Sequence, residues 1–99
     1  MAIIHGNEQN FEELITGELV LVDFFAEWCG PCKILAPVLE DLEKIDVVKI
    51  DVDENPELAK KFGIMSVPTL MIFRNGEMKS NRSGAMPKPM LEKWIEENK

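Results

Sequence analysis

The sequence contains few of the residues that build structural metal sites or disulfide frameworks. Two cysteines and one histidine, His5, are present in 99 residues. A structural zinc site takes four ligands, usually two cysteine pairs or one pair with two histidines. A zinc site within one chain is therefore not expected, and only a site shared across a dimer stays open. Small secreted domains commonly carry several scattered disulfides, so one close pair favours a cytoplasmic or organelle-stromal protein.

Concentrated positive charge is also absent. Eleven Lys and Arg residues against eighteen Asp and Glu residues leave a net charge of −7, and no basic cluster interrupts this balance. Binding to nucleic acid needs such a cluster, because the protein must neutralise phosphates. We therefore expect no nucleic-acid partner and interpret the acidity as a contribution to solubility.

Long apolar runs are missing as well. The most apolar stretch, ELVLVDFFA (18–26), is too short to cross a bilayer and contains Asp23. The N-terminal sequence MAIIHGNEQNFEEL has neither a basic n-region nor a long apolar core, so it does not resemble a secretory signal. We expect no membrane partner and a cytoplasmic location, and a signal removed before the first residue stays open.

The composition, 45% hydrophobic and 29% charged, suits one globular domain over residues 1–99. Helical and extended patterns alternate along it, separated by short turn signals. In chain order they predict a strand at 2–4, a helix from the capping box 10–13 to Gly17, a strand at 19–25, a helix at 31–45 kinked at Pro37, a strand at 47–53, a helix at 55–63, strands at 69–73 and 77–83 around the turn Asn75-Gly76, and a helix from 87. This order predicts an α/β protein with four helices on the two faces of a mixed sheet of four to five strands.

Three helix details follow from the same signals. Asn55 is the expected N-cap of the helix at 55–63, and Gly63 is its expected stop. Trp94 belongs to the apolar face of the last helix, so we assign it to core packing. The helix at 31–45 has apolar side chains at helical spacing: Ile34, Leu35, Val38, Leu39, Leu42 and Ile45.

Both cysteines lie in FFAEWCGPCKILAP (24–37), where an apolar strand ends and a helix begins. The first turn of a helix has unpaired N–H groups and partial positive charge, so Cys29 should ionise more readily than a free thiol. Pro31 fits the first turn and stiffens it. Cys32 should face the core, which predicts an exposed nucleophile and a buried resolving thiol. A structural disulfide is disfavoured, because a bridge closing so short a loop constrains the unfolded chain very little.

Asp23 interrupts the apolar strand before the cysteines. Burial would raise the pKa of its carboxyl toward neutrality, and such a group can take the proton from Cys32 through water. An aspartate turned to solvent at an edge or bulge is the alternative, and the pattern alone leaves both open. Lys49, on its own, is a strand lysine that reaches water, and His5 is a solvated residue near the terminus.

The stretches VDFFAEWCGPCKILAP, DVDENPELAKKFGIMSVPTLMIFRNGE and SGA together resemble the thioredoxin family over essentially the whole chain. The WCGPC motif is specific, and it is accompanied in order by Asp23, Pro37, Lys49, Pro68 and Gly84. The resemblance implies the thioredoxin fold and a protein-disulfide reductase without a cofactor. It also implies a monomer that a thioredoxin reductase recharges, with roles in electron transport and cell redox homeostasis.

The resemblance also implies residue roles. Cys29 attacks a disulfide of a client protein, and Cys32 resolves the mixed disulfide. Asp23 serves as the base, and Lys49 on the neighbouring strand pairs with it. Pro68 is implied to follow a cis peptide bond opposite the cysteines.

A client-docking surface is implied around Cys29. Val67, the residue before the implied cis bond, would hydrogen-bond an extended client segment as an added strand. Trp28 would cover the rim of the site, with core filling as its alternative. The implied surface consists of Trp28, Gly30, Pro31, Val67, Pro68, Gly84 and Ala85.

Several positions depart from the family pattern. Phe25 stands where many thioredoxins have tryptophan, and Pro87 stands where a helix-capping hydroxyl is common. The link before VVKID is short. Met65, Ser66 and Ser83 differ from the usual residues of the docking loops, so client preference is open.

Two other functions remain as alternatives. An oxidase or isomerase would use the same chemistry in the other direction, although oxidising relatives often carry histidine where Pro31 stands. A non-catalytic binding module would use the docking surface around Trp28 and Pro68 for a partner subunit.

Overall fold

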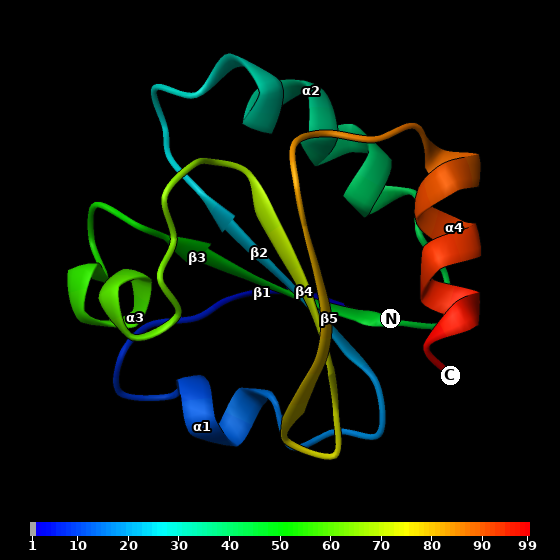
Figure 1. The fold of residues 1–99 in the computed structure, drawn as a ribbon, viewed down its shortest axis with the longest axis horizontal. Helices are drawn as coiled ribbons and strands as arrows, with labels where there is room; N and C mark the ends of the chain where they lie inside the picture. The colour runs from blue at the N-terminus through cyan, green and yellow to red at the C-terminus, as the bar shows by residue number, and fades with distance from the viewer. Residues whose placement is uncertain (1) are drawn as a thin grey trace.

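The computed structural model describes residues 2–99, and Figure 1 shows their fold. Within these described residues, five strands form one sheet in the order β1-β3-β2-β4-β5. The strands are β1 (Ile3–His5), β2 (Val20–Phe25), β3 (Asp46–Asp51), β4 (Thr69–Arg74) and β5 (Glu77–Ser83). The helices are α1 (Phe11–Leu14), α2 (Gly30–Glu40), α3 (Pro56–Lys61) and α4 (Lys88–Glu97).

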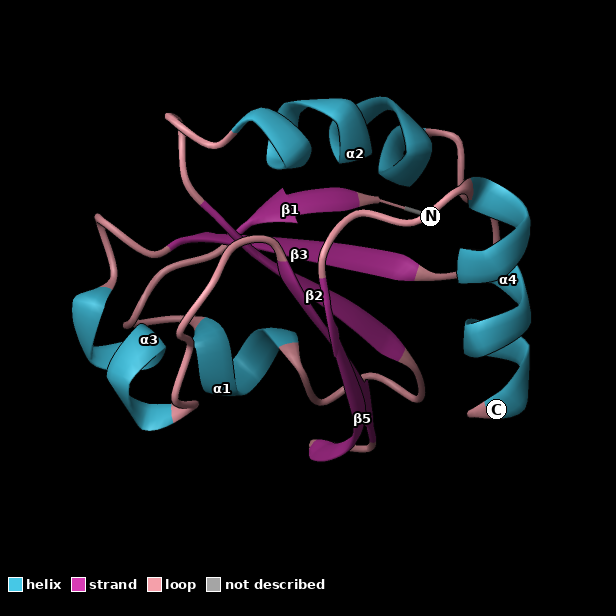
Figure 2. Ribbon diagram, turned by 45° about the horizontal axis from the view of Figure 1, so that its top comes forward, coloured by secondary structure: helices cyan, strands magenta, loops and turns pink. Residues whose placement is uncertain are grey.

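The sheet is mixed, as predicted. β1, β3 and β2 run parallel, whereas β4 pairs antiparallel with both β2 and β5. Figure 2 shows the sheet between α2 on one side and α1 with α3 on the other. The parallel half needs crossover helices, because a parallel connection cannot be a tight hairpin. The antiparallel half is closed by the turn Asn75-Gly76, whose φ angles of 51° and 87° suit a type I′ hairpin.

Each face of the sheet has its own apolar core. On the face of α1 and α3, Phe11 packs with Phe24, Phe62 and Phe73 at ring-centroid distances of 5.4 to 6.5 Å. On the other face, the residues of β2, β3 and β4 pack against α2 and α4. Trp94 is buried there, as predicted, and its indole N–H donates to Ser80 Oγ at 2.9 Å.

β2 lies between β3 and β4, and all six of its residues are buried. The predicted continuous apolar strand is therefore confirmed. A strand in this position is covered on both faces and paired on both edges, so the Asp23 side chain within it is buried.

Helix α2 is shorter than its apolar pattern predicted. It ends at Glu40 instead of residue 45, and Lys44 adopts a left-handed φ of 67°. Leu42 and Ile45 still reach the core from the connecting loop, so their spacing reflected burial without helical structure. Ile34 was expected on the buried face but is 71% exposed.

The predicted N-cap positions of α1 and α3 are confirmed, but the expected cap hydrogen bonds are not formed. Asn10 and Asn55 are the N-cap residues, and neither side chain makes a cap hydrogen bond to its helix. The Asn55 side chain instead accepts from the backbone N–H of Glu8 at 3.0 Å. The Glu8 carboxylate accepts from the N–H of Glu57 at 2.7 Å, so a residue distant in sequence caps α3.

The predicted stops differ in outcome. α1 ends at Leu14, before Gly17, and consists of one turn. Gly63 follows Phe62, the C-cap residue of α3, and has a φ of +62°. This left-handed conformation ends the helix as predicted, because glycine adopts it without a Cβ clash. Within residues 2–99, no helix combines the length and the apolarity that crossing a bilayer requires.

Candidate functional site

Cys29 and Cys32 form a disulfide at the start of α2, with their Cα atoms 5.3 Å apart. Cys29 has an extended backbone and is the N-cap residue of the helix, and Pro31 lies in the first turn. The chain reaches this point from the carboxyl end of β2, through a turn closed by the Cys29 N–H and the Ala26 carbonyl at 3.2 Å. The expected transition from strand to helix is confirmed.

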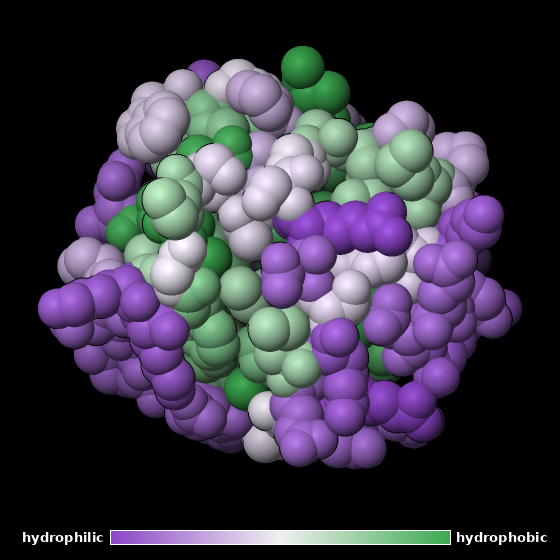
Figure 3. All heavy atoms as spheres, viewed as in Figure 1, coloured by the Kyte–Doolittle hydropathy of each residue, from purple (hydrophilic) through white to green (hydrophobic). Residues whose placement is uncertain are grey.

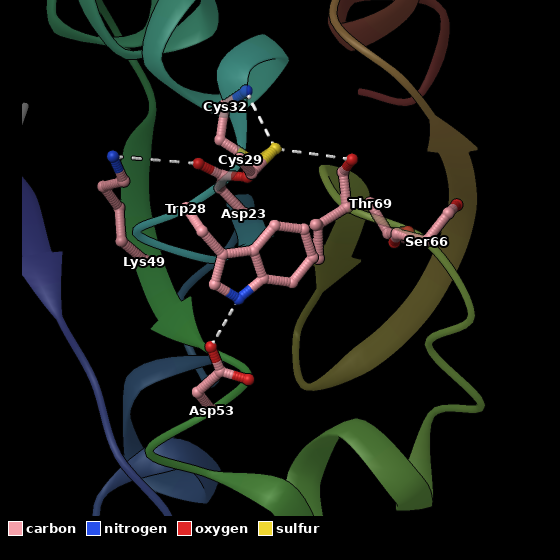
Figure 4. Close-up of a disulfide and its surroundings, with 9 residues drawn as sticks. Asp23, Trp28, Cys29, Cys32, Lys49, Asp53, Ser66 and Thr69 are labelled. Carbon is pink, nitrogen blue, oxygen red and sulfur yellow. Dashed lines mark hydrogen bonds and ion pairs between the residues drawn. A yellow bond between two sulfur atoms is a disulfide. The ribbon is translucent and has the colours of Figure 1, made fainter.

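The helix terminus is directed at the sulfur of Cys29. The backbone N–H of Cys32 donates to Cys29 Sγ, with a donor–acceptor distance of 3.1 Å. On its other side this sulfur lies 3.5 Å from the carbonyl oxygen of Val67, and Figure 4 shows the contact with the Cys32 N–H. A sulfur in the N-cap position also meets the positive end of the helix dipole. This geometry stabilises negative charge on the Cys29 sulfur when the disulfide is reduced.

The expected contrast between an exposed Cys29 and a buried Cys32 is wrong for the disulfide form. Their side chains are 3% and 4% exposed, respectively. Both belong to a buried cluster with Phe25 and Ala26, against which Val67 packs. The two cysteines differ in hydrogen bonding instead, because Cys29 Sγ accepts an N–H from the helix terminus.

Asp23 is completely buried in β2, so the solvent-edge alternative is wrong. Its two oxygens have no hydrogen-bond partner among residues 2–99. Burial raises the pKa of this carboxyl from 3.8 to about 6, and the positive charge of Lys49 offsets part of the rise. The carboxyl therefore titrates close to neutral pH.

Lys49 lies directly opposite Asp23 in the register of β2 and β3. Its Nζ is 3.9 Å from Asp23 Oδ2, and Figure 4 shows the pair. Nζ also lies 4.7 Å from the ring centroid of Phe25, a cation–π arrangement that fixes the ammonium group over the strand. The side chain is mostly buried, so the reading of Lys49 as a water-reaching lysine is wrong.

Val67 and Pro68 are joined by a cis peptide bond at the start of β4. The Pro68 carbonyl accepts from the Gly84 N–H at 2.8 Å, and Thr69 Oγ1 donates to the Ser66 carbonyl at 2.7 Å. These two bonds fix the loop beside the cysteines from both sides. Gly84 has a φ of +90°, a backbone conformation that favours glycine at this position.

Trp28 is 70% exposed, so it is not core filler. Its indole N–H donates to Asp53 Oδ2 at 2.8 Å, which holds the ring in place, as Figure 4 shows. Sequence reasoning missed Asp53. A signal was present, because β2 and β3 are parallel and the residues after their carboxyl ends meet at one edge of the sheet.

Apolar hollows border the loop that contains the cis bond and helix α2. One of about 280 Å³ is lined in part by Trp28, Val52, Met65 and Val67, and we call it the Met65 groove. Another of about 290 Å³ lies between Ile34 and the segment after β5, which includes Ala85. Figure 3 shows hydrophobic residues gathered between α3 and α2, with hydrophilic residues over α3 and α4.

The remaining residues of the expected docking surface also lie at this end of the sheet. Gly30, Pro31 and Ala85 are exposed, whereas Pro68 is buried. His5 is exposed, as expected, and its ring packs edge-on against Phe25 with centroids 6.4 Å apart.

Comparison with known proteins places this geometry in a family. The thioredoxin family model matches residues 2–97. Thioredoxin of Bacillus subtilis is 46% identical over 100 residues and covers 96% of both chains. Thioredoxin of Staphylococcus haemolyticus is 47% identical over 103 residues and covers 99% of both chains.

Solved structures agree with the sequence comparisons. The structure of Plasmodium falciparum thioredoxin has a TM-score of 0.86 at 38% identity and covers 100% of both chains. A mutant thioredoxin from Halobacterium salinarum has a TM-score of 0.87 at 37% identity, over 97% of this chain and 88% of that chain. The chain belongs to the thioredoxin family and is a thiol–disulfide oxidoreductase that carries the family's cysteine pair at Cys29 and Cys32.

Proposed function

We propose that this chain reduces disulfides in client proteins and is itself reduced again by a thioredoxin reductase. The observation that carries the direction of attack is the hydrogen bond from the Cys32 N–H to Cys29 Sγ. It favours the thiolate at Cys29 over a thiolate at Cys32, because it stabilises charge at the first sulfur. Cys29 is therefore the nucleophile of the proposal, and Cys32 is the resolving thiol.

The reaction proceeds in two exchanges. The Cys29 thiolate attacks one sulfur of the client disulfide, the client S–S bond breaks, and the departing sulfur leaves as a thiolate that takes a proton. Cys32 then loses its proton and attacks Cys29 Sγ, which releases the second client sulfur. The client gains two electrons, and the chain ends as the Cys29–Cys32 disulfide that the structure contains.

Asp23 is the proposed base for the second exchange. With a pKa of about 6, its carboxyl is ionised in most molecules at neutral pH and can still accept a proton. The proton passes from Cys32 to Asp23 through an intervening water. Lys49 is a positioning residue in this scheme, since its charge keeps the pKa of Asp23 from rising further.

Clients dock as an extended segment across the loop that contains the cis bond. The backbone of Val67 pairs with the segment as an added strand, and Pro68 has no N–H that would compete for the sulfurs. Apolar contacts come from the rim: Trp28, Gly30, Pro31, Gly84 and Ala85. Asp53 joins this proposal as the residue that orients Trp28.

The oligomeric state, the cellular location and the cellular roles of the chain are part of the same proposal. The chain acts as a single-domain monomer without a cofactor in the cytoplasm, where it takes part in electron transport and redox homeostasis. Neither an oxidase or isomerase role nor a purely non-catalytic binding role gains support from the site or from the relatives.

A coupled turnover assay tests the proposal. NADPH, a bacterial-type thioredoxin reductase, this chain and a protein with an accessible disulfide are mixed, and NADPH oxidation is followed. Turnover should require all components and vanish in Cys29→Ser. Failure of the chemically reduced chain to reduce the client in a single turnover would contradict the reductase function. Success in that single turnover without NADPH oxidation would contradict only the reductase partner.

A further inference from the structure

Met65 has the most exposed large apolar side chain in the part of the chain that the structure describes, at 95%. It lies in the loop between α3 and β4, and its neighbours fix the backbone there. The N–H of Ile64 donates to the Ala59 carbonyl at 2.9 Å, and the Ser66 carbonyl accepts from Thr69 Oγ1 at 2.7 Å. The thioether is therefore presented to solvent from a fixed loop.

The Met65 groove is continuous with the cysteine site. Val52 and Val67 line the groove and also pack against the cluster that contains Cys29 and Cys32. Trp28 forms another part of its wall. A client segment paired with Val67 would therefore place neighbouring side chains against the Met65 thioether.

The redox form of the site determines which sulfur an oxidant meets. In the disulfide form, the Cys29 and Cys32 side chains are almost completely buried and carry no thiolate. Met65 is then the exposed sulfur at this end of the sheet. Oxidation of methionine follows exposure, and it converts a flexible apolar side chain into a polar one.

The other described methionines are less accessible. Met71 and Met86 are buried, and Met78 and Met90 are about half-exposed on β5 and α4. The Met78 sulfur also accepts a weak contact from the Asn81 side-chain amide at 4.0 Å. These residues serve as internal references for the reactivity of Met65.

We propose that Met65 is a methionine-oxidation site: peroxides oxidise it while the chain is in its disulfide form, and the resulting sulfoxide weakens client docking once the cysteine pair is reduced. The Met65 sulfur attacks one oxygen of hydrogen peroxide, the O–O bond breaks, and an S–O bond forms. The leaving hydroxide takes the proton of the transferred hydroxyl, so the products are methionine sulfoxide and water. The sulfur loses two electrons and the peroxide gains them.

The consequence for docking rests on the proposed function. The sulfoxide oxygen is a strong hydrogen-bond acceptor, so pressing it against apolar client side chains costs free energy. The exchange chemistry at Cys29 and Cys32 is unaffected, because Met65 does not touch the sulfurs in this scheme. Oxidation should therefore lower kcat/KM for a protein client and leave the reaction with a small disulfide unchanged.

The test treats the disulfide form of the full chain with hydrogen peroxide, removes the peroxide, and maps added oxygen by peptide mass spectrometry over time. Met65 should be oxidised before Met78 and Met90. Equal or faster oxidation of those two residues would overturn the proposal. This part does not depend on turnover, so it stands even if the proposed function fails.

The second part measures turnover of the treated chain against its own untreated sample. We expect kcat/KM for a protein client to fall roughly three- to tenfold, the loss expected for one contact residue of an interface. The rate with a small aromatic disulfide should stay unchanged. Reduction of the sulfoxide by a methionine sulfoxide reductase should restore the lost activity.

Two variants separate Met65 from other oxidation events. Peroxide treatment should leave the kcat/KM of Met65→Leu unchanged. The kcat/KM of Met90→Leu should fall by the same factor as that of the unaltered chain. Equal losses in both variants, or full client turnover by chain oxidised at Met65, would overturn the docking effect. Absent turnover in the untreated chain would instead count against the proposed function.

Discussion

The buried carboxyl of Asp23 should make folding stability depend on pH. The folded protein holds the proton of this group up to a pKa of about 6, whereas the unfolded chain loses it near 3.8. Between these values the folded state binds more protons than the unfolded state. The contribution of Asp23 to stability is therefore highest below the lower value, falls as pH rises through the interval, and levels off above about 6.

The size of the effect follows from the same two values. A difference of one pKa unit corresponds to about 1.4 kcal/mol, so the rise from 3.8 to about 6 amounts to roughly 3 kcal/mol. Asp23→Asn removes the ionisation and nearly preserves the shape. Relative to the unaltered protein, this variant should gain roughly 3 kcal/mol of unfolding free energy between pH 3.5 and pH 7. Asp23→Ala should show the same trend and slow the resolving step.

The assay is urea unfolding of the disulfide form, followed by far-UV circular dichroism at several pH values. Comparing the variant with the unaltered protein at each pH cancels the contributions of all other groups. Asp46→Asn serves as the control, because it makes the same change at an exposed position on the neighbouring strand. It should follow the unaltered protein at every pH.

Lys49→Met provides a second check on the cause. Lys49 lowers the pKa of Asp23 from 3.9 Å away, so its removal should extend the loss of stability to higher pH. The reasoning is refuted if the difference between Asp23→Asn and the unaltered protein is the same at pH 3.5 and pH 7. That result would mean that the carboxyl is not desolvated.

Three further predictions concern the cysteine pair and α2. Cys32→Ser should trap mixed disulfides with clients on non-reducing gels, whereas Cys29→Ser should trap none; the opposite pattern would reverse the assigned roles. Pro31→His should raise the reduction potential of the pair, measured against a glutathione buffer, because a cation beside the thiolate stabilises the reduced form; an unchanged potential would remove Pro31 as an argument for a reductase. Leu35→Ala should lower the unfolding free energy by about 2–5 kcal/mol, whereas Ile34→Ala should change it by less than about 0.5 kcal/mol, because the first side chain is buried and the second is 71% exposed. Similar losses in urea unfolding would show that both side chains are packed in solution.

Patterns among residues close together in the sequence predicted the strands, helices and turns and the reactive cysteine pair. The apolar run of β2, the stop at Gly63 and the turn Asn75-Gly76 each depend on local backbone preference or on continuous burial. The position of Cys29 at a helix start is local in the same sense, because it follows from a strand pattern, Pro31 and a helical pattern. These features could be predicted because each is specified within one or two turns of chain.

Contacts between distant segments could not be predicted in this way. Asn55 is the N-cap residue of α3, yet the side-chain cap hydrogen bond comes from Glu8, far away in sequence. Ile34 matches the apolar spacing of α2 but lies outside the buried face. An asparagine before a helix can form a cap hydrogen bond or bind elsewhere, and an isoleucine in a helix can be buried or exposed. The packing of other segments decides which of these occurs.

Residue patterns were therefore enough to predict the order of strands and helices, the place of the two cysteines and the family that they indicate. Only the tertiary structure established that Asp23 is fully buried beside Lys49, that Asp53 holds Trp28, and that Met65 is exposed next to the disulfide. The physical reason is that backbone preferences act between adjacent residues, whereas desolvation, ion pairing and exposure depend on which segments the folded sheet brings together.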